Sequence, residues 1–440
     1  MRSVVFIALM MTVGQAMAWS NHAMLLWPVV RESSTLMEER LVAEPLEAFV
    51  RAESDAIAAI LEEVEQWSIE HIEAYPITPA ELRFKPAQEE SSLGDFLAAI
   101  RVNPDLEYGL FRQGTIDDPA SDEATMGWRQ VSFLGVQNST RDLVYYPLKP
   151  GDFTSPAHVL ITANDEPDHG MDVGLYADNG TPFGEVYGFG LQPFGNPNLD
   201  YSSQAPFHMG FYHLDWLTKQ VESDLLRTLP AWRIRLYESL AGLAFKTGHH
   251  YWGWRFMGWA LHYIGDLTQP YHADPLPGVS LMSSIWLVVQ GKTADAIQLV
   301  SNRHGVLESY QLERTKKAQA AKDWRGPLLS ALHFSEEACL HSGTDIIALT
   351  GGSEALGRHL DHTLAHYAPP RFVDDASFEW TGSGYEAEVD RLIGIFGGEQ
   401  ALVSLDEELL THLRRFSFFT SGWVNQALAF ESGAPGGCPK

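Results

Sequence analysis

One segment constrains this chain more than any other: His262-Tyr-Ile-Gly-Asp266-Leu-Thr-Gln-Pro270-Tyr-His272. Residues from about Tyr251 to Asp266 have helical spacing, and a helix places positions i and i+4 on one face. His262 and Asp266 can therefore offer a ring nitrogen and a carboxylate oxygen to one metal ion. Pro270 ends the helix, so the chain can turn and direct His272 to a neighbouring metal.

A second histidine–carboxylate pair follows at the same spacing. His304 and Glu308 are again four residues apart, and imidazole and carboxylate ligands suit zinc. Either pair alone is most simply explained as an ordinary surface or structural pair. Two such pairs, with a histidine after a helix-ending proline, together favour a metal centre.

The N-terminus is typical of an exported protein. A positive charge, an apolar run from Val4 to Val13 and the small-residue pattern Ala16-Met17-Ala18 predict a secretory signal peptide over residues 1–18. Cleavage would leave a mature chain that begins Trp19-Ser-Asn-His22. Because a free α-amine has a pKa of roughly 8, it can lose its proton and bind a metal. We therefore expect a secreted or periplasmic protein in which processing creates a ligand at Trp19, close to His22.

Charge and cysteine content narrow the functional classes. The net charge of −27 disfavours binding of nucleic acid through the overall field, although a nuclease whose metals meet the phosphate locally stays open. Beyond the short N-terminal run, no apolar segment is long enough to span a bilayer. Cys339 and Cys438 are too few for a cysteine-rich zinc site, and export permits a disulfide between them.

Periodicity predicts a mainly α fold with an irregular part. Helices are expected over three regions: Leu46–Ala74, Phe211–His249 with an interruption at Pro230, and most of the chain after Ser280. Short strands or extended loops are expected over three others: Val131–Val136, Leu143–Tyr146 and His158–Thr162. Residues 163–210 have the composition of one long loop, and its aromatic content argues against disorder.

These motifs resemble those of the zinc-dependent phospholipase C / P1 nuclease family. Its members begin, after processing, with a tryptophan whose amine and carbonyl bind zinc. They then carry H-x-x-x-D-x-x-x-x-x-H, matched here by His262, Asp266 and His272, with the family's G-D-x-x-Q-P at 265–270. They continue with H-x-x-x-E or H-x-x-x-D, and His304 and Glu308 give the glutamate form of the phospholipase C branch. The resemblance covers the first mature residues and about 165–310.

The resemblance implies a mostly helical fold around a trinuclear zinc cluster, that is, about three Zn²⁺ per chain. We expect the catalytic domain to span residues 19–310, with an irregular, short-strand insertion at about 75–162. Residues 311–440 would form a helical C-terminal extension. The family also needs an aspartate and a histidine before the helix motif, and we choose Asp168 and His208. Because their separation is longer than in the family, an inserted loop is expected between them, and four other residues stay open as alternatives: Asp165, Asp172, His169 and His213.

The resemblance also implies the distribution of ligands. One zinc would be held by Trp19, His22 and Asp266, with Asp266 bridging, a second by Asp168, His208, His262 and Asp266, and a third by His272, His304 and Glu308. Zinc ions neutralise phosphodiester oxygens and lower the pKa of bound water towards 7, and that water would attack phosphorus. Asp168 is also the candidate catalytic residue, because it can orient or deprotonate the water.

Two substrates compete within the family. A phospholipase C would cut phospholipids such as phosphatidylcholine into diacylglycerol and phosphorylated headgroup, in transient contact with a membrane surface. The aromatic loop and the acidic balance suit a cationic headgroup. A P1-type single-strand nuclease would want basic residues along its groove, and such stretches are missing near the motifs. We therefore expect a phospholipase C and not a nucleic acid partner, with the nuclease as the alternative and a non-catalytic zinc-binding protein as the third interpretation. No protein partner is implied.

Overall fold

The computed structural model of this chain describes residues 19, 21–86, 93–118, 124–135, 140, 142–195, 204–214, 223–277, 293–340 and 345–433. It is mainly helical, with 62% helix and 3% strand, which confirms the predicted mainly α class. No helix among these residues is long and apolar enough to cross a membrane. The predicted signal peptide lies outside the described residues. Cys339 is disulfide-bonded, and Cys438, the other cysteine of the chain, also lies outside them.

The first half of the chain forms short helices and two small sheets. Its α-helices are α1 (His22–Val30), α2 (Ser34–Glu38), α3 (Leu46–Ala52), α4 (Ser54–His71), α5 (Leu93–Ala99), α6 (Pro156–Asp165), α7 (Pro182–Val186) and α8 (Ala205–His208). Its 3₁₀ turns are η1 (Ala80–Leu82), η2 (Trp128–Gln130), η4 (Glu166–His169) and η5 (Ser223–Leu226). The antiparallel pairs are β1 (Leu41–Val42) with β4 (Phe153–Thr154), and β2 (Phe111–Gln113) with β3 (Tyr145–Pro147).

Longer helices dominate the second half. They are α10 (Pro230–Lys246), α11 (His250–Thr268), α14 (Thr293–Ala320), α16 (Asp345–Tyr367) and α18 (Val389–Glu431), and the short ones between them are α12 (Pro270–Ala273), α15 (Pro327–Ser330), α17 (Pro370–Val373) and η6 (Glu386–Glu388). Helix α18 is kinked at Gly398, where φ is 71°.

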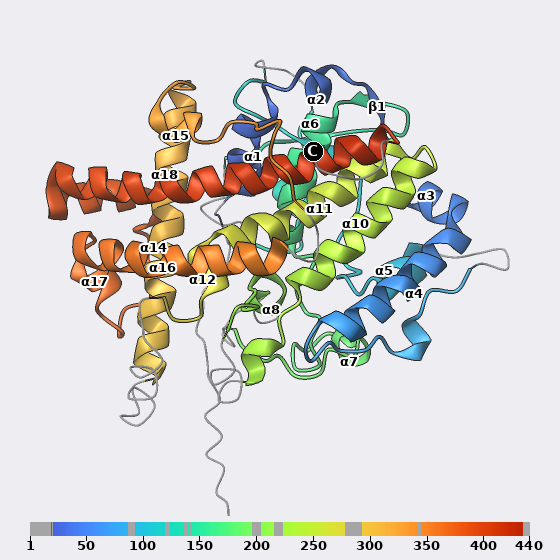
Figure 1. The fold of residues 1–440 in the computed structure, drawn as a ribbon, viewed down its shortest axis with the longest axis horizontal. Helices are drawn as coiled ribbons and strands as arrows, with labels where there is room; N and C mark the ends of the chain where they lie inside the picture. Colours follow the sequence, from blue (N-terminus) through green and yellow to red (C-terminus); the bar gives the residue numbers. More distant parts are fainter. Residues whose placement is uncertain are drawn as a thin grey trace, which may run out of the picture.

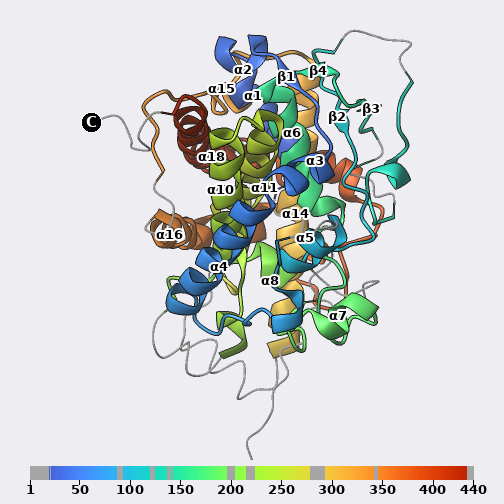
Figure 2. The same ribbon diagram turned by 90° about the vertical axis from the view of Figure 1, so that its right-hand side faces the viewer.

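Helix α11 is the centre of the molecule. Every residue from Tyr251 to Thr268 is buried, because α11 packs against α6, α10, α16 and α18 (Figures 1 and 2). Gly258 permits the close approach of α6, since a Cβ at that position would lie 2.5 Å from the Cβ of Ala163. A helix enclosed in this way holds the side chains on its polar positions in fixed places.

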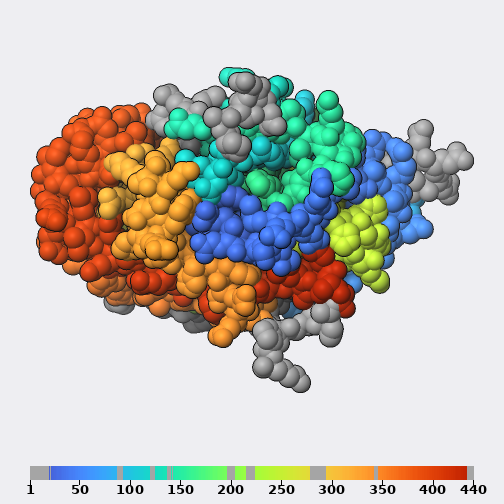
Figure 3. All heavy atoms as spheres, turned by 90° about the horizontal axis from the view of Figure 1, so that it is seen from above, coloured from blue at the N-terminus to red at the C-terminus, as the bar shows by residue number. Residues whose placement is uncertain are grey.

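The C-terminal helices pack directly on this centre. Helices α16 and α18 run side by side across α14 (Figure 1), and α18 also contacts α1 and α10. The indole of Trp423 donates to the carbonyl of Met257 on α11 at 3.0 Å. Seen from above, the first described residues, coloured dark blue, lie between the orange and red C-terminal part and the teal to green residues (Figure 3). One continuous apolar core extends from Trp19 to Ala427, and the predicted boundary at residue 310 falls inside α14.

Several local predictions are wrong, and the reasons are physical. His158–Thr162 is part of helix α6 rather than a strand, because Ser155 caps the helix, Pro156 occupies its first turn, and burial outweighs the strand preference of Val, Ile and Thr. Pro230 begins α10 instead of interrupting a helix, as a proline does at a first helical position. The helix expected over Leu46–Ala74 is divided at Glu53 and ends at His71. Within 163–210, short helices replace the single long loop.

Candidate metal centre

Helix α11 supplies the middle of the site. His262 and Asp266 lie one turn apart and fully buried, with His262 Nε2 3.5 Å from Asp266 Oδ2. His262 Nδ1 lies 2.7 Å from the backbone carbonyl oxygen of Asn164. Because a carbonyl only accepts, Nδ1 carries the proton, and the lone pair of Nε2 points towards Asp266. Nε2 of His262 is thus an atom that could bind a metal ion.

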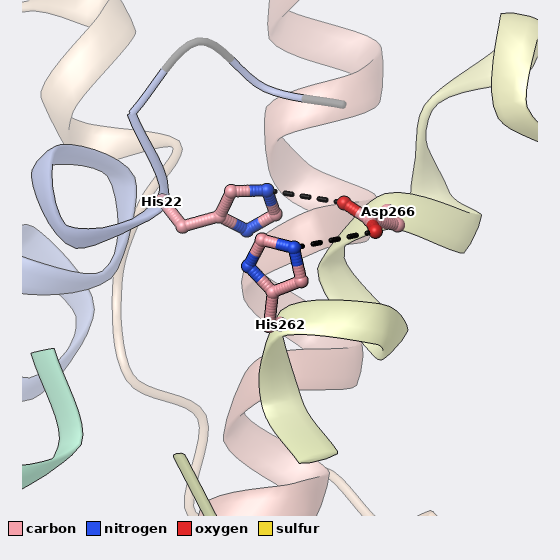
Figure 4. A group of neighbouring side chains, drawn as sticks. All are labelled: His22, His262 and Asp266. Carbon is pink, nitrogen blue, oxygen red and sulfur yellow. Dashed lines mark ion pairs between the residues drawn. The ribbon is translucent and has the colours of Figure 1, made fainter. Parts of the chain in front are cut away.

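His22 reaches the same carboxylate from α1. Its Nε2 lies 3.1 Å from Asp266 Oδ1, and its ring centroid lies 4.1 Å from that of His262 (Figure 4). Gly265 makes room for this ring, since a Cβ there would lie 3.0 Å from His22 Nδ1. The three side chains form one of three buried groups in which the possible ligand atoms all lie within 4.8 Å of one another.

Helix α1 is held in place through its N-terminus. Asp165 Oδ1 accepts the backbone N–H of Ala23 at 3.1 Å, and Asp165 Oδ2 accepts from Gln113 Nε2 at 2.9 Å. Asn21 caps the helix by accepting the N–H of Met24 at 2.7 Å. Asp165 therefore contacts the backbone beside His22 and is a support of this ligand, not a member of a ligand group.

Trp19 lies at the end of α11. Its fully buried indole donates from Nε1 to the hydroxyl of Thr268 at 3.1 Å, two residues after Asp266. Residues 1–18 and Ser20 lie outside the described residues, so ligation by the processed main chain of Trp19 stays a prediction.

The second group brings two further segments to His262. Asp168 comes from η4 and His208 from α8. Asp168 Oδ1 lies 3.7 Å from His262 Nε2 and 3.9 Å from His208 Nδ1, and these two ring nitrogens lie 3.0 Å apart. His208 Nδ1 is also 2.9 Å from Asp266 Oδ2. Asp266 therefore contacts histidines of both the first and the second group.

Hydrogen bonding separates Asp168 from the other acidic residues nearby. Four buried carboxylates occur between residues 165 and 172. Three of them accept hydrogen bonds from neighbouring side chains: Asp165 from Gln113, Glu166 from Arg255 and Asp172 from Arg233. Neither oxygen of Asp168 has a hydrogen-bond partner within the described residues. Because a buried carboxylate without donors is costly unless a cation meets it, the structure favours Asp168 as the ligand over Asp165 and Asp172.

His208 is similarly distinguished from the alternative histidines. Its Nε2 lies 3.5 Å from Asp172 Oδ2, and Tyr263 donates to that same oxygen at 2.6 Å. A carboxylate behind a histidine is the usual support of a metal ligand. His169 instead packs among the rings of Phe111, Trp128 and Tyr145, and His213 is half-buried; neither belongs to a ligand group of the described residues.

The third group combines α12 and α14. His304 Nε2 lies 2.7 Å from Glu308 Oε1, as their spacing of four residues on a helix predicts. His272 follows the turn at Pro270, and its ring centroid lies 5.0 Å from that of His304. His272 Nδ1 lies 2.9 Å from the carbonyl oxygen of His208, so Nε2 keeps its lone pair and has no hydrogen-bond partner in the described chain.

Burial and neighbouring charges together shift the pKa values of the side chains in the site. Burial raises the pKa of Asp168 to about 7. Burial also lowers the pKa of His272 to about 3, which leaves an uncharged ring at neutral pH. For His208, burial opposes protonation, but Asp266 and Asp172 outweigh it and raise the pKa to about 10. At neutral pH, the proton on His208 thus balances the negative charge of the neighbouring carboxylates. A metal ion bound to His208 would displace this proton and supply the positive charge instead.

A mainly apolar pocket opens beside the third group. His304 forms part of its wall, and the other lining residues are Met209, Phe211, Tyr271, Pro275, Ile297, Val300 and Ser301. Apart from His304, the described lining residues carry no ionisable side chain except the phenol of Tyr271. A ligand bound at His304 would therefore place an uncharged, apolar part against this wall.

No protein-family model, curated protein or solved structure matches this chain.

Proposed function

We propose that this chain is a secreted zinc-dependent phosphodiester hydrolase, a phospholipase C that resembles the phospholipase C / P1 nuclease family in fold and site. The observation that carries the proposal is the convergence of eight side chains into three adjoining buried groups. They come from separate segments, between His22 and Glu308, and each is a residue that the family resemblance assigns as a ligand.

The donor set fits zinc. The three groups offer only histidine nitrogens and carboxylate oxygens, which are ligands that zinc accepts at tetrahedral sites. Several of these atoms are buried without a hydrogen-bond partner among the described residues, including both oxygens of Asp168 and Nε2 of His272. Polar atoms buried in this way are expected where an ion completes the structure.

The side chains around the centre would bind, orient and support a phosphodiester. When bound, zinc ions supply the charge that neutralises the phosphodiester oxygens and activates a water molecule. Neither oxygen of Asp168 accepts a hydrogen bond from the described residues, so one could bind a metal while the other orients a water molecule. Asp172 and the carbonyl of Asn164 hold the rings of His208 and His262 behind the site.

The surroundings favour a phospholipid over a nucleic acid. The pocket beside His304 is mainly apolar, and none of its lining residues within the described part of the chain is a lysine or arginine. A single-strand nuclease uses basic side chains to follow the backbone, and the net charge of −27 opposes that role. An apolar wall next to a metal group suits the glycerol and acyl part of a lipid.

The test is release of phosphocholine from phosphatidylcholine vesicles by the processed protein that begins at Trp19. We expect release by zinc-loaded protein, loss of release with a chelator, and recovery when zinc is returned. His208→Gln should lose activity, whereas His213→Gln, outside the ligand groups, should keep it. Zinc-loaded protein that releases no phosphocholine but cuts single-stranded DNA or RNA would replace the lipid substrate with the nuclease alternative. A protein that binds zinc and cleaves neither would contradict the hydrolase proposal.

A further inference from the structure

The residues that precede two of the proposed ligands are joined through one carboxylate of the C-terminal part. Tyr271, next to His272, donates its hydroxyl to Asp361 Oδ1 at 2.9 Å. Arg303, next to His304, donates from Nη1 to Asp361 Oδ2 at 2.7 Å. Asp361 lies on α16 and is buried. It therefore connects α12 and α14, the two helices that carry the third group.

Tyr271 also contacts a ligand ring directly. Its ring stacks on that of His304, with the centroids 5.4 Å apart and an angle of 25° between the planes. Because the hydroxyl is fixed by Asp361, the plane against which His304 packs is fixed as well. The same side chain thus affects His272 through the backbone and His304 through stacking.

Arg303 has two further hydrogen-bond partners besides Asp361. Its Nε donates to the carbonyl of Val373 at 2.9 Å, and Nη2 lies 3.1 Å from Asp374 Oδ1. Asp374 is 54% exposed, whereas Asp361 is 8% exposed, by side chain. Exposed ion pairs contribute little to the free energy of unfolding. A buried carboxylate that accepts hydrogen bonds from two donors, in contrast, restricts the positions of both donors. Asp361 and Asp374 therefore form a matched pair of aspartates on one arginine.

We propose that Asp361 is a positioning residue of the metal centre, which ties Tyr271 to Arg303 and so fixes the geometry of the His272–His304–Glu308 group. The inference rests on the proposed function, because it takes this group to hold a metal. It gives a role to α16, a helix that contributes no member to the three ligand groups of the described residues. Hydrogen bonds behind a ligand act by restricting its orientation, and Asp361 would do so through the residues next to His272 and His304.

The experiment compares zinc affinity in three variants of the processed full-length protein. Asp361→Asn keeps the shape of the side chain but replaces an oxygen acceptor with an amide donor. Tyr271→Phe keeps the stacked ring and removes only the hydroxyl. Asp374→Asn is the control on the exposed side of Arg303. Zinc per chain is measured in competition with a chelating dye, and the visible absorption spectrum is recorded after substitution with Co²⁺, which reports ligand geometry.

We expect one of the bound zinc ions to bind about tenfold more weakly in Asp361→Asn and in Tyr271→Phe. The cobalt spectrum should change in both, and the control should match the wild type. A purely structural role would lower the unfolding midpoint and leave zinc affinity and the spectrum unchanged, and that result would overturn the inference. If Asp361→Asn does not fold, wild-type zinc affinity in Tyr271→Phe is enough to reject it. Wild-type protein that binds no zinc would instead overturn the proposed function, and the inference with it.

Discussion

Asp168 differs from the neighbouring aspartates in the surroundings of its carboxylate. It is buried, it has no hydrogen-bond donor among the described residues, and burial raises its pKa to about 7. Its neighbours Asp165 and Asp172 have the same charge but accept hydrogen bonds from Gln113 and Arg233. Of these three aspartates, only Asp168 has no hydrogen-bond donor among the described residues. Carboxylates with a strongly raised pKa concentrate at functional sites.

This arrangement predicts that Asp168→Asn stabilises the zinc-free protein. An unfolded aspartate titrates near pH 3.9, so the folded protein binds more protons than the unfolded chain between about pH 4 and pH 7. The cost of the charged carboxylate is absent below that range and complete above it. At pH 8 in chelator we expect the unfolding midpoint of Asp168→Asn to exceed that of wild type by on the order of 2 °C or more. The difference should shrink as the pH falls towards 4.

When zinc is present, the wild type should be more stable than Asp168→Asn. The amide is a poor metal ligand, so zinc should stabilise the wild type more than the variant, and phosphodiester hydrolysis should be lost in the variant. Thermal unfolding with and without zinc at pH 5 and pH 8 checks both statements. A variant less stable than wild type in chelator at pH 8 would show that protein groups already compensate Asp168.

At the scale of elements, the position of α1 depends on its N-terminus. Its first residue is His22, which directly follows the cap residue Asn21. The helix is joined to α6 by the hydrogen bond from Ala23 N–H to Asp165. Helix ends carry backbone N–H groups without helical partners, so a buried end needs an acceptor. Asp165 is that acceptor, and it also bonds Gln113 of β2.

We expect Asp165→Ala to weaken the metal group that contains His22. The change leaves a buried backbone N–H without an acceptor, which costs about 1–3 kcal/mol in the free energy of unfolding. Zinc content should fall by one ion per chain when a chelating dye competes, and the other ions should stay bound. The measurement is zinc titration together with urea unfolding.

The neighbouring helix α2 offers a control for this prediction. Ser33 caps it by accepting the N–H of Leu36 at 3.4 Å, and α2 carries no proposed ligand. Ser33→Ala should cost about 1 kcal/mol and leave zinc content unchanged. Equal zinc loss in both variants would mean that general destabilisation, and not the docking of α1, explains the effect.

At the scale of the whole molecule, sequence alone is informative where function imposes spacing. The pairs His262–Asp266 and His304–Glu308 could be placed on helix faces because positions four residues apart share a face. Asp168 could not be separated from Asp165 by sequence, since only the hydrogen-bond partners distinguish them. Those partners come from residues more than 50 positions away, such as Gln113.

The C-terminal part was beyond sequence reasoning for a related reason. Its helices contribute no member to the ligand groups of the described residues, and periodicity predicts that they are helices but not what they pack against. In the structure, Phe416 of α18 lies against Gly265, and its Cε2 is 3.0 Å from the position that a Cβ of residue 265 would take. Gly265 is also the residue that makes room for the ring of His22. Similarly, His158–Thr162 has the composition of a strand, and its burial against α11, together with the cap at Ser155, explains why it is helical.

The contact at Gly265 predicts that the C-terminal part is needed for the metal centre. Phe416→Ala removes a fully buried ring and should cost about 3–5 kcal/mol in the free energy of unfolding. It should also weaken zinc binding, because the ring packs beside His22. Phe418, two residues along the same helix, is 49% exposed, so Phe418→Ala should change neither stability nor zinc content appreciably. Urea unfolding and zinc titration of both variants test this. The contrary result would be a Phe416→Ala protein whose C-terminal helices unfold in a separate transition while its zinc content stays complete. In that case those helices form an independent module, and the apolar core from Trp19 to Ala427 does not unfold as one cooperative unit.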